Sequence, residues 1–267
     1  MVKLCRFELK SNPGEARSGM VYSGKIYETD GANAVAVHEA DAIRPLIPVP
    51  HAPSLRIFRG DLQPDSIVSD VIELPRFFYG NPISLVGASQ IITFPEATNA
   101  LGYETFVAAI LVGDAYQIEV ELADDLILGF TILNMLVARD RERIEKLSGA
   151  IGSSHDLGGA LGPVLTTPDE LDDFVTDAEF GKRYALSAVI RVNGVERQRG
   201  NVESLPFTFA QAISSASQSC TLKAGDIIAL GPIVDPEMDP MILDPGDEVQ
   251  LAVENLGAIS LKLSLLQ

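Results

Sequence analysis

Four polar side chains have the types and settings that chemistry needs. Glu104 interrupts the mostly apolar stretch LGYETFVAAI, His155 and Asp156 are adjacent in the glycine-rich stretch AIGSSHDLGGALGP, and Tyr79 precedes a turn in FFYGNP. Carboxylates and imidazoles exchange protons with substrates, and a phenol can donate a hydrogen bond to a substrate oxygen. His155 and Asp156 suggest an acid–base pair, although chain neighbours orient each other poorly, which favours an ordinary loop histidine. Tyr79 equally suits a surface tyrosine packed over a turn.

The elements that must position these groups are mainly strands. In YALSAVIRVNGVERQR, residues 186–192 alternate between apolar and polar, and Asn193-Gly194 supplies a tight hairpin turn. Ser23-Gly24 similarly joins two short strands. AGDIIALG and PGDEVQLAV each place a Gly-Asp turn before an apolar strand, and residues 206–220 have the apolar spacing of a helix. The sequence therefore predicts a β-dominated α+β protein.

The composition limits the class of protein. The chain has 267 residues, 46% of them hydrophobic, and its 37 acidic and 20 basic residues give a formal charge of −17. A surface of this charge repels nucleic acid and anionic lipid. The first residues, MVKLCRFELK, lack the apolar run of a secretory signal, and the longest apolar run is too short to span a membrane. We expect a cytoplasmic protein with reduced cysteines and no nucleic-acid or membrane partner.

Two domains are expected. Residues 1–64 have the short strands of a small N-terminal β-rich domain, and residues 65–267 form the larger domain. The proline-rich stretch IRPLIPVPHAPSLRIF, residues 43–58, is typical of a linker because proline lacks a backbone donor and restricts its predecessor.

Eight segments in the same order resemble the fumarylacetoacetate hydrolase family: PSLRIF (53–58), FFYGNPISLVG (77–87), LGYETFVAAI (101–110), ILGFTILNMLVARD (127–140), GPVLTTPDEL (162–171), RVNGVERQ (191–198), TLKAGDIIALG (221–231) and LDPGDEV (243–249). The resemblance implies a distorted β-roll or barrel domain behind a small N-terminal domain, and a homodimer. It also implies cleavage, decarboxylation or isomerisation of β-dicarbonyl or 2-oxo acid substrates around a divalent metal, which stabilises an enolate.

Most of the family's polar positions carry other residues here. Carboxylates of the family pattern fall at Glu104 but also at Ile57, Phe106 and Met135, and the base histidine falls near Pro64. The loop lysine falls at Ser153 and a late threonine at Pro232. A divalent cation takes about six oxygen ligands. One carboxylate among apolar side chains cannot supply them, so we expect no metal and no other cofactor.

The resemblance then implies an apolar substrate pocket where the ion would sit. Its expected residues are Phe78, Phe106, Asn134, Met135, Arg139, Ser153 and Pro232, with Glu104, Tyr79 and His155 as candidate catalytic residues. Beside Phe106 and without a metal, Glu104 is expected either to have a raised pKa and donate a hydrogen bond, or to form a salt bridge with Arg139. Residues 139–143 are expected to begin a solvated helix with Arg139 turned inward.

Our preferred hypothesis is a metal-independent cyclase or isomerase in natural-product biosynthesis. Its substrate would be large, apolar and polyketide-like, with a tetronate- or tetramate-like β-dicarbonyl group, held in a reactive geometry by apolar walls. One alternative is a metal-dependent C–C hydrolase, decarboxylase or hydratase of 2-oxo or β-dicarbonyl acids. Its ligands would come from Asp114, Glu119, Glu121, Asp124 and Asp125. The other alternative is a non-catalytic binding or scaffold protein.

Overall fold

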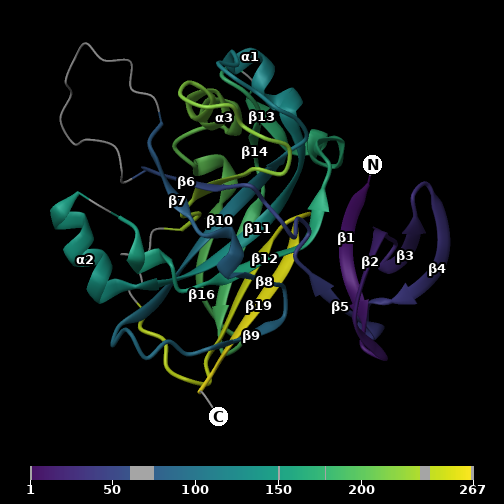
Figure 1. The fold of residues 1–267 in the computed structure, drawn as a ribbon, viewed down its shortest axis with the longest axis horizontal. Coiled ribbons are helices and arrows are strands. Elements are labelled where there is room, and N and C mark those ends of the chain that lie inside the picture. The colour runs from purple at the N-terminus through teal and green to yellow at the C-terminus, as the bar shows by residue number, and fades with distance from the viewer. Residues whose placement is uncertain (1, 61–74, 150, 178, 235–240, 266–267) are drawn as a thin grey trace.

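The structure is a computed structural model that describes residues 2–60, 75–149, 151–177, 179–234 and 241–265. Within these residues, strands dominate and helices are few and short (Figure 1). The α+β, β-dominated fold class predicted from the sequence is confirmed. No helix in the described ranges combines the length and hydropathy that a membrane crossing requires.

The larger sheet contains twelve strands among the described residues, in the order β4-β3-β2-β1-β12-β11-β10-β17-β6-β7, with β5 also paired to β1 and β8 to β12. The N-terminal strands, purple in Figure 1, thus continue the main sheet through the β1–β12 pairing. These strands are β1 (Lys3–Leu9), β2 (Asn12–Tyr22), β3 (Lys25–Asp30), β4 (Asn33–Glu39), β5 (Ile43–Leu46), β6 (Leu55–Arg59), β7 (Phe77–Gly80), β8 (Leu85–Gly87), β10 (Leu101–Leu111), β11 (Ile127–Ala138), β12 (Gly159–Thr166) and β17 (Ile227–Gly231).

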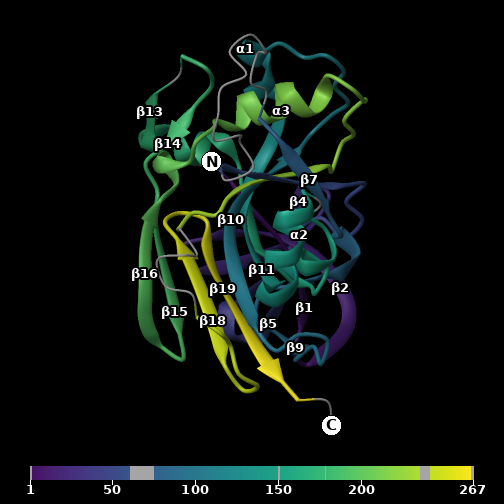
Figure 2. The same ribbon diagram turned by 90° about the vertical axis from the view of Figure 1, so that its left-hand side faces the viewer.

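A second sheet lies against the centre of the first and encloses the main core (Figure 2). It has the order β16-β15-β18-β19-β9, and a separate pair of short strands joins β13 and β14. The strands are β9 (Gln90–Thr93), β13 (Val175–Asp177), β14 (Arg183–Tyr184), β15 (Ser187–Val192), β16 (Val195–Asn201), β18 (Glu248–Val253) and β19 (Gly257–Ser264). Alternate side chains of β10 and β11 fill this core, and the intervening ones face a second, smaller apolar cluster.

The helices lie at the ends and sides of the sheets. They are α1 (Val120–Ala123), α2 (Arg139–Ser148) and α3 (Phe209–Ser217), with 3-10 turns η1 (Ala40–Ala42), η3 (Pro82–Ser84), η4 (Asp124–Leu126), η5 (Ser153–His155), η6 (Pro168–Phe174) and η7 (Val202–Ser204). A capping box between Thr208 and Gln211 begins α3. Phe209, Ile213 and Ala216 bury one face of it, as the spacing predicted.

Several local predictions are confirmed. Asn193-Gly194 turns β15 into β16, and Ser23-Gly24 turns β2 into β3, all four residues with positive φ. Both Gly-Asp turns lead into strands, β17 and β18.

The linker prediction is wrong at both ends of residues 43–58. Ile43–Leu46 is strand β5, and Leu55–Arg59 is the fully buried strand β6, which pairs in parallel with β17. The prolines lie in β5 and between the two strands. Strand β6 contains none, so all its backbone amides can donate hydrogen bonds. The predicted domain boundary at 64 and the base position at Pro64 lie outside the described residues.

Candidate active site

Glu104 is the centre of a buried cluster of ionised groups. It lies near the start of β10, directly opposite Met135 of β11, with its side chain on the face that carries the smaller apolar cluster. The carboxylate is fully buried. An isolated charge in such a place is very costly, so the surrounding cations decide what Glu104 can do.

Arg59, the last residue of β6, supplies a buried cation in contact with both oxygens of this carboxylate. Its Nη1 lies 2.8 Å from both carboxylate oxygens of Glu104, 3.2 Å from Oε1 of Glu142 and 3.1 Å from Nε2 of His155. The Arg59 side chain is 1% exposed. One guanidinium nitrogen thus meets two carboxylates and an imidazole inside the protein.

The start of α2 contributes Arg139 and Glu142. Arg139 Nη1 donates to Glu104 Oε1 at 2.7 Å and to Glu142 Oε2 at 2.7 Å, and its Nη2 donates to the Tyr103 carbonyl. Positions three apart on a helix lie on the same side, so the first turn carries both groups inward. The predicted inward turn of Arg139 and its salt bridge with Glu104 are confirmed.

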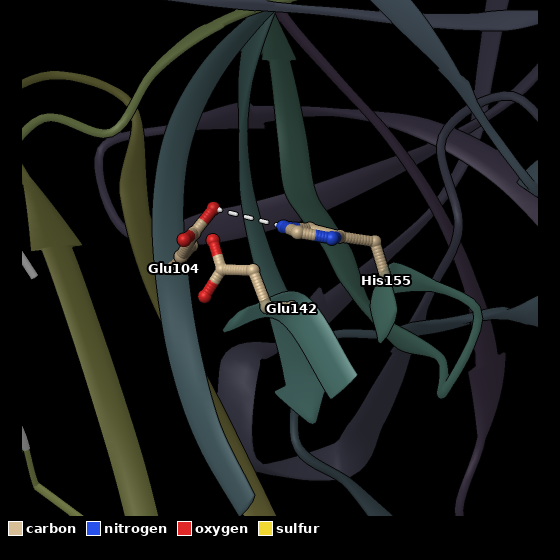
Figure 3. A group of neighbouring side chains, drawn as sticks. All are labelled: Glu104, Glu142 and His155. Carbon is tan, nitrogen blue, oxygen red and sulfur yellow. Dashed lines mark hydrogen bonds and ion pairs between the residues drawn. The ribbon is translucent and has the colours of Figure 1, made fainter. Parts of the chain in front are cut away.

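His155 enters the cluster from the glycine-rich loop, in the short turn η5. Its Nε2 lies 3.3 Å from Glu104 Oε2, and its Nδ1 lies 2.9 Å from Ser154 Oγ. Figure 3 shows Glu104, Glu142 and His155 pointing toward one another from β10, α2 and η5. The interpretation of His155 as an ordinary loop histidine is wrong, because its side chain is 1% exposed and faces Glu104.

Glu145 of α2 fixes this loop. Its carboxylate accepts hydrogen bonds from the Gly152 and Ser154 amides and from the Ser153 and Ser154 hydroxyls. Because Ser154 gives its proton to Glu145, its oxygen is left to accept the Nδ1 proton of His155. Asp156, the chain neighbour of His155, instead accepts a hydrogen bond from Asn81.

The electrostatics keep Glu104 ionised. Burial by itself would raise its pKa, but the hydrogen bond with His155 and the charges of Arg59 and Arg139 outweigh burial and lower the pKa to about 2. The expectation of a raised Glu104 pKa and a protonated, hydrogen-bond-donating carboxyl is therefore wrong. The hydrogen bond and the two guanidinium groups together lower the Glu104 pKa by more than its apolar surroundings, which include Phe106, raise it.

Comparison with known proteins decides the family. Residues 62–264 match the model of the fumarylacetoacetate (FAA) hydrolase C-terminal domain, which is more than half of the chain. The chain belongs to the fumarylacetoacetate hydrolase family.

Named relatives of this family member are enzymes. The chain is 30% identical over 196 residues to the oxaloacetate tautomerase YisK of Bacillus subtilis, covering 72% of this chain and 62% of that protein. It is 27% identical over 187 residues to a 2,4-didehydro-3-deoxy-L-rhamnonate hydrolase of Sphingomonas sp., covering 68% and 62%. The chain therefore spans less than two thirds of the length of either relative.

Solved structures share the family fold. The fumarylacetoacetate hydrolase of Exiguobacterium antarcticum superposes with a TM-score of 0.78 at 24% identity, over 100% of both chains. A 5-carboxymethyl-2-hydroxymuconate delta-isomerase of Mycobacterium smegmatis gives 0.75 at 19% identity, over 99% of this chain and 100% of that one. The predicted family fold is confirmed.

The divalent metal that the family implies does not fit the residues present. Among the described residues, Glu104, Glu142 and His155 offer ligand atoms within 4.8 Å of one another. The Arg59 nitrogen, however, already contacts an atom of all three, and a cation cannot share that space. The family's other carboxylate positions, Ile57, Phe106 and Met135, are buried and apolar. None of the five acidic residues proposed as alternative ligands, at 114–125, belongs to this group.

Two cavities open near the cluster. One of about 330 Å³ is lined by Glu104, Arg139 and Glu142, together with Tyr103, Lys146, Met241 and others. Another, of about 500 Å³, is lined by His155, Tyr79 and Ser153 with Gly80, Asn81, Pro82, Gly152 and Asp156. The structure therefore brings all three predicted catalytic residues to this region, although Glu104 and Tyr79 line different cavities.

The predicted pocket residues divide into two groups. Phe78 packs its ring against His155 at 4.9 Å between centroids, and Arg139 and Ser153 line the two cavities. Phe106, Met135, Asn134 and Pro232 line neither cavity.

The apolar replacements are packed into the interior. Phe106 and Met135 belong to the smaller apolar cluster and are at most 1% exposed. The backbone of Gly231 closes against the Phe106 ring, just before Pro232. Asn134 is buried on the other face of β11, where its Cα is paired with that of Thr105. Its amide has no hydrogen-bond partner among the described residues. These side chains fill space rather than surround it.

Sequence reasoning missed Arg59 and Glu142. Arg59 ends an apolar strand in LRIFR, and a cation in a strand buried along its whole length signals a buried counter-charge. Glu142 stands three residues after Arg139, a spacing that pairs charges on a helix.

Proposed function

We propose that this family member is an isomerase that moves a proton on a small substrate with a β-dicarbonyl or 2-oxo acid group, with His155 as the base. The observation that carries the proposal is the contact between the His155 ring and the buried Glu104 carboxylate, whose pKa is lowered to about 2. A buried carboxylate next to an imidazole stabilises the imidazolium that forms when the ring takes a proton.

The glycine-rich loop sets which ring nitrogen of neutral His155 carries the proton. Ser154 accepts the Nδ1 proton, so the neutral ring has an unprotonated Nε2, which accepts from Arg59. When Nε2 gains a proton, it donates to Glu104 instead. To take the substrate proton, Nε2 exchanges its hydrogen bond from Arg59 for the new N–H bond and then donates to Glu104, and the reverse exchange returns the proton.

The proposed reaction needs no water and no nucleophile. The base removes the proton between two carbonyl carbons, the C–H electron pair moves to a carbonyl oxygen as an enolate, and His155 returns the proton to a different atom. Tyr79 lines the same cavity as His155 and is proposed to donate its hydroxyl hydrogen bond to the enolate oxygen. Relatives named as a tautomerase and an isomerase support this class of reaction.

The test is keto–enol equilibration of oxaloacetate, followed by the ultraviolet absorbance of the enol. Replacement of His155 by Gln removes the base, and we expect the rate to fall by about 10²–10⁴-fold. His38→Gln is a matched control, because His38 also pairs with a glutamate, Glu28, but on the N-terminal strands. Unchanged rates in His155→Gln would contradict the assignment.

Cyclisation of a larger apolar substrate is the second candidate. It is favoured by the apolar side chains beside the His155 cavity, where Tyr79 is 61% exposed and Ile83 is 92% exposed. A polyketide-like tail could lie over these residues while its dicarbonyl group reaches His155. Saturation transfer from the protein to a long-chain acyl tetronate, absent in Ile83→Ser, would distinguish this substrate from a small oxo acid. We further propose, from the family resemblance, that the protein acts as a homodimer.

A further inference from the structure

We propose that Arg59 is a built-in cation that takes the place of a divalent ion in the Glu104–Glu142–His155 cluster. The inference rests on the proposed assignment of this cluster as the active site. It adds the source of positive charge and a prediction about what the site cannot bind.

The position of the guanidinium is the first argument. The three groups that could ligate an ion converge within 4.8 Å, and a single nitrogen of Arg59 lies within 3.2 Å of an atom from each of them. Hydrogen bonds to both oxygens of Glu104 have equal lengths of 2.8 Å, so the nitrogen sits symmetrically before the carboxylate. This is the place that a chelated cation would take.

The backbone holds Arg59 in that position. Arg59 ends β6, and its Cα is paired with Gly231 of β17 in a parallel ladder. The side chain is 1% exposed and packs beside strands of the smaller apolar cluster. An incoming ion would have to displace a buried guanidinium into apolar surroundings, which is unfavourable by the cost of an unpaired buried charge.

Positive side chains already balance the two carboxylates of the cluster. Glu104 and Glu142 together carry two negative charges, Arg59 and Arg139 each contact both carboxylates, and Lys146 lies 3.2 Å from Glu142 at the cavity edge. A divalent cation added to this set would meet two guanidinium groups. Arginine stays protonated at any physiological pH, so this positive charge is permanent.

Arg59 is therefore a positioning residue. It keeps Glu104 ionised and donates to Nε2 of neutral His155, and it lines neither of the two cavities. Its charge replaces the electrostatic part of what an ion would do, while its fixed donors set the orientation of the acid–base pair.

The test is a titration of the full chain with Mn²⁺, followed by electron paramagnetic resonance and by the melting temperature. We expect the wild-type protein to show no site that depends on Glu104. Arg59→Ala removes the internal cation, and we expect it to bind one Mn²⁺ at least about tenfold tighter than wild type, because the cluster regains free carboxylate charge. Bound Mn²⁺ should raise the melting temperature of this variant.

Arg56→Ala is the matched control. Arg56 is also buried on β6 and also pairs with a carboxylate, that of Asp226, but away from the cluster. It should lose stability without gaining a manganese site. Arg59→Lys retains the charge and should also gain none.

Two outcomes would overturn the proposal. One is a wild-type Mn²⁺ site that disappears in Glu104→Gln, and this measurement needs no folded Arg59 variant. The other is a folded Arg59→Ala protein that gains no site. Neither outcome touches the His155 assignment, which is measured by enol conversion, so the two proposals fail separately.

Discussion

Two buried arginines of the same strand, three residues apart, show how differently one sheet can use a cation. Successive side chains of a strand alternate between faces, so Arg56 and Arg59 point to opposite sides of β6. Arg56 Nη1 lies 3.1 Å from Asp226 and 2.6 Å from Ser54, whose hydroxyl donates in turn to the same carboxylate, and Nη2 contacts the Cys220 sulfur.

The flat face of Arg56 is covered as well. Its guanidinium lies over the rings of Phe77 and Tyr79, at 5.9 and 5.4 Å from the centroids. Arg56 is thus paired with one carboxylate and covered by two aromatic rings, as in a structural ion pair. Arg59 instead shares one nitrogen among two carboxylates and an imidazole, all beside cavities. A buried charged cluster therefore suggests chemistry when it contains more than one ion pair and lies beside a cavity.

Removing one carboxylate from each cluster should give the largest difference between the two arginines. Glu104→Gln and Asp226→Asn each leave a buried arginine without its charge partner, and each should lower the free energy of unfolding by about 3–5 kcal/mol, measured in urea. Only Glu104→Gln should also lower the rate of enol conversion, by about 10²–10⁴-fold, since it alone removes the group that stabilises protonated His155.

The rates should be compared per folded molecule at a temperature where both variants are folded. An equal loss of activity in Asp226→Asn would mean that the two clusters do not differ in function.

Acid should weaken the Arg59 cluster in a defined pH range. The folded-state pKa of Glu104 is about 2, below its ordinary value of 4.5, so its contribution to stability is present above about pH 4.5 and is lost as the pH falls toward 2. The stability difference between wild type and Glu104→Gln should shrink by about 3 kcal/mol between pH 5 and pH 2. Urea unfolding of both proteins across this range checks it, and a constant difference would show that Glu104 does not titrate there.

The smallest effects should come from Tyr79, whose ring lies over Arg56 and which lines the cavity of His155. Tyr79→Leu removes a ring from the face of Arg56 and should cost about 0.5–1 kcal/mol of stability. Tyr79→Phe keeps the ring and should change stability by less than about 0.5 kcal/mol, while slowing enol conversion through the lost hydroxyl. Equal rates in Tyr79→Phe and wild type would remove the phenol from the proposed mechanism.

Local structure followed from local sequence. The Asn193-Gly194 hairpin, the face of α3 with Phe209 and Ile213, and the inward Arg139 each depend on residues close in the chain, and each was predicted correctly. The family resemblance likewise located Glu104 and the loop of His155.

The missing part of the site depends on distant contacts. Arg59 meets Glu104 across 45 residues and His155 across 96, and no local pattern reports such a meeting. Without Arg59, the replacement of carboxylates at Ile57, Phe106 and Met135 suggests an apolar substrate pocket. These side chains are instead buried and packed in one apolar cluster, because a well-filled interior is more stable than one with a void.

The parallel pairing of β6 with β17 has a consequence for the order in which the chain can fold during synthesis. The β6 ladder joins Leu55 to Ile227 and Arg59 to Gly231, so its hydrogen-bonding partner leaves the ribosome more than 170 residues later. Until then the guanidinium of Arg59 has no fixed place, and pairing across such a separation is slow. The nascent chain therefore lacks the β17 partner of β6 through most of its synthesis, and β6 gains this partner only after β17 has docked.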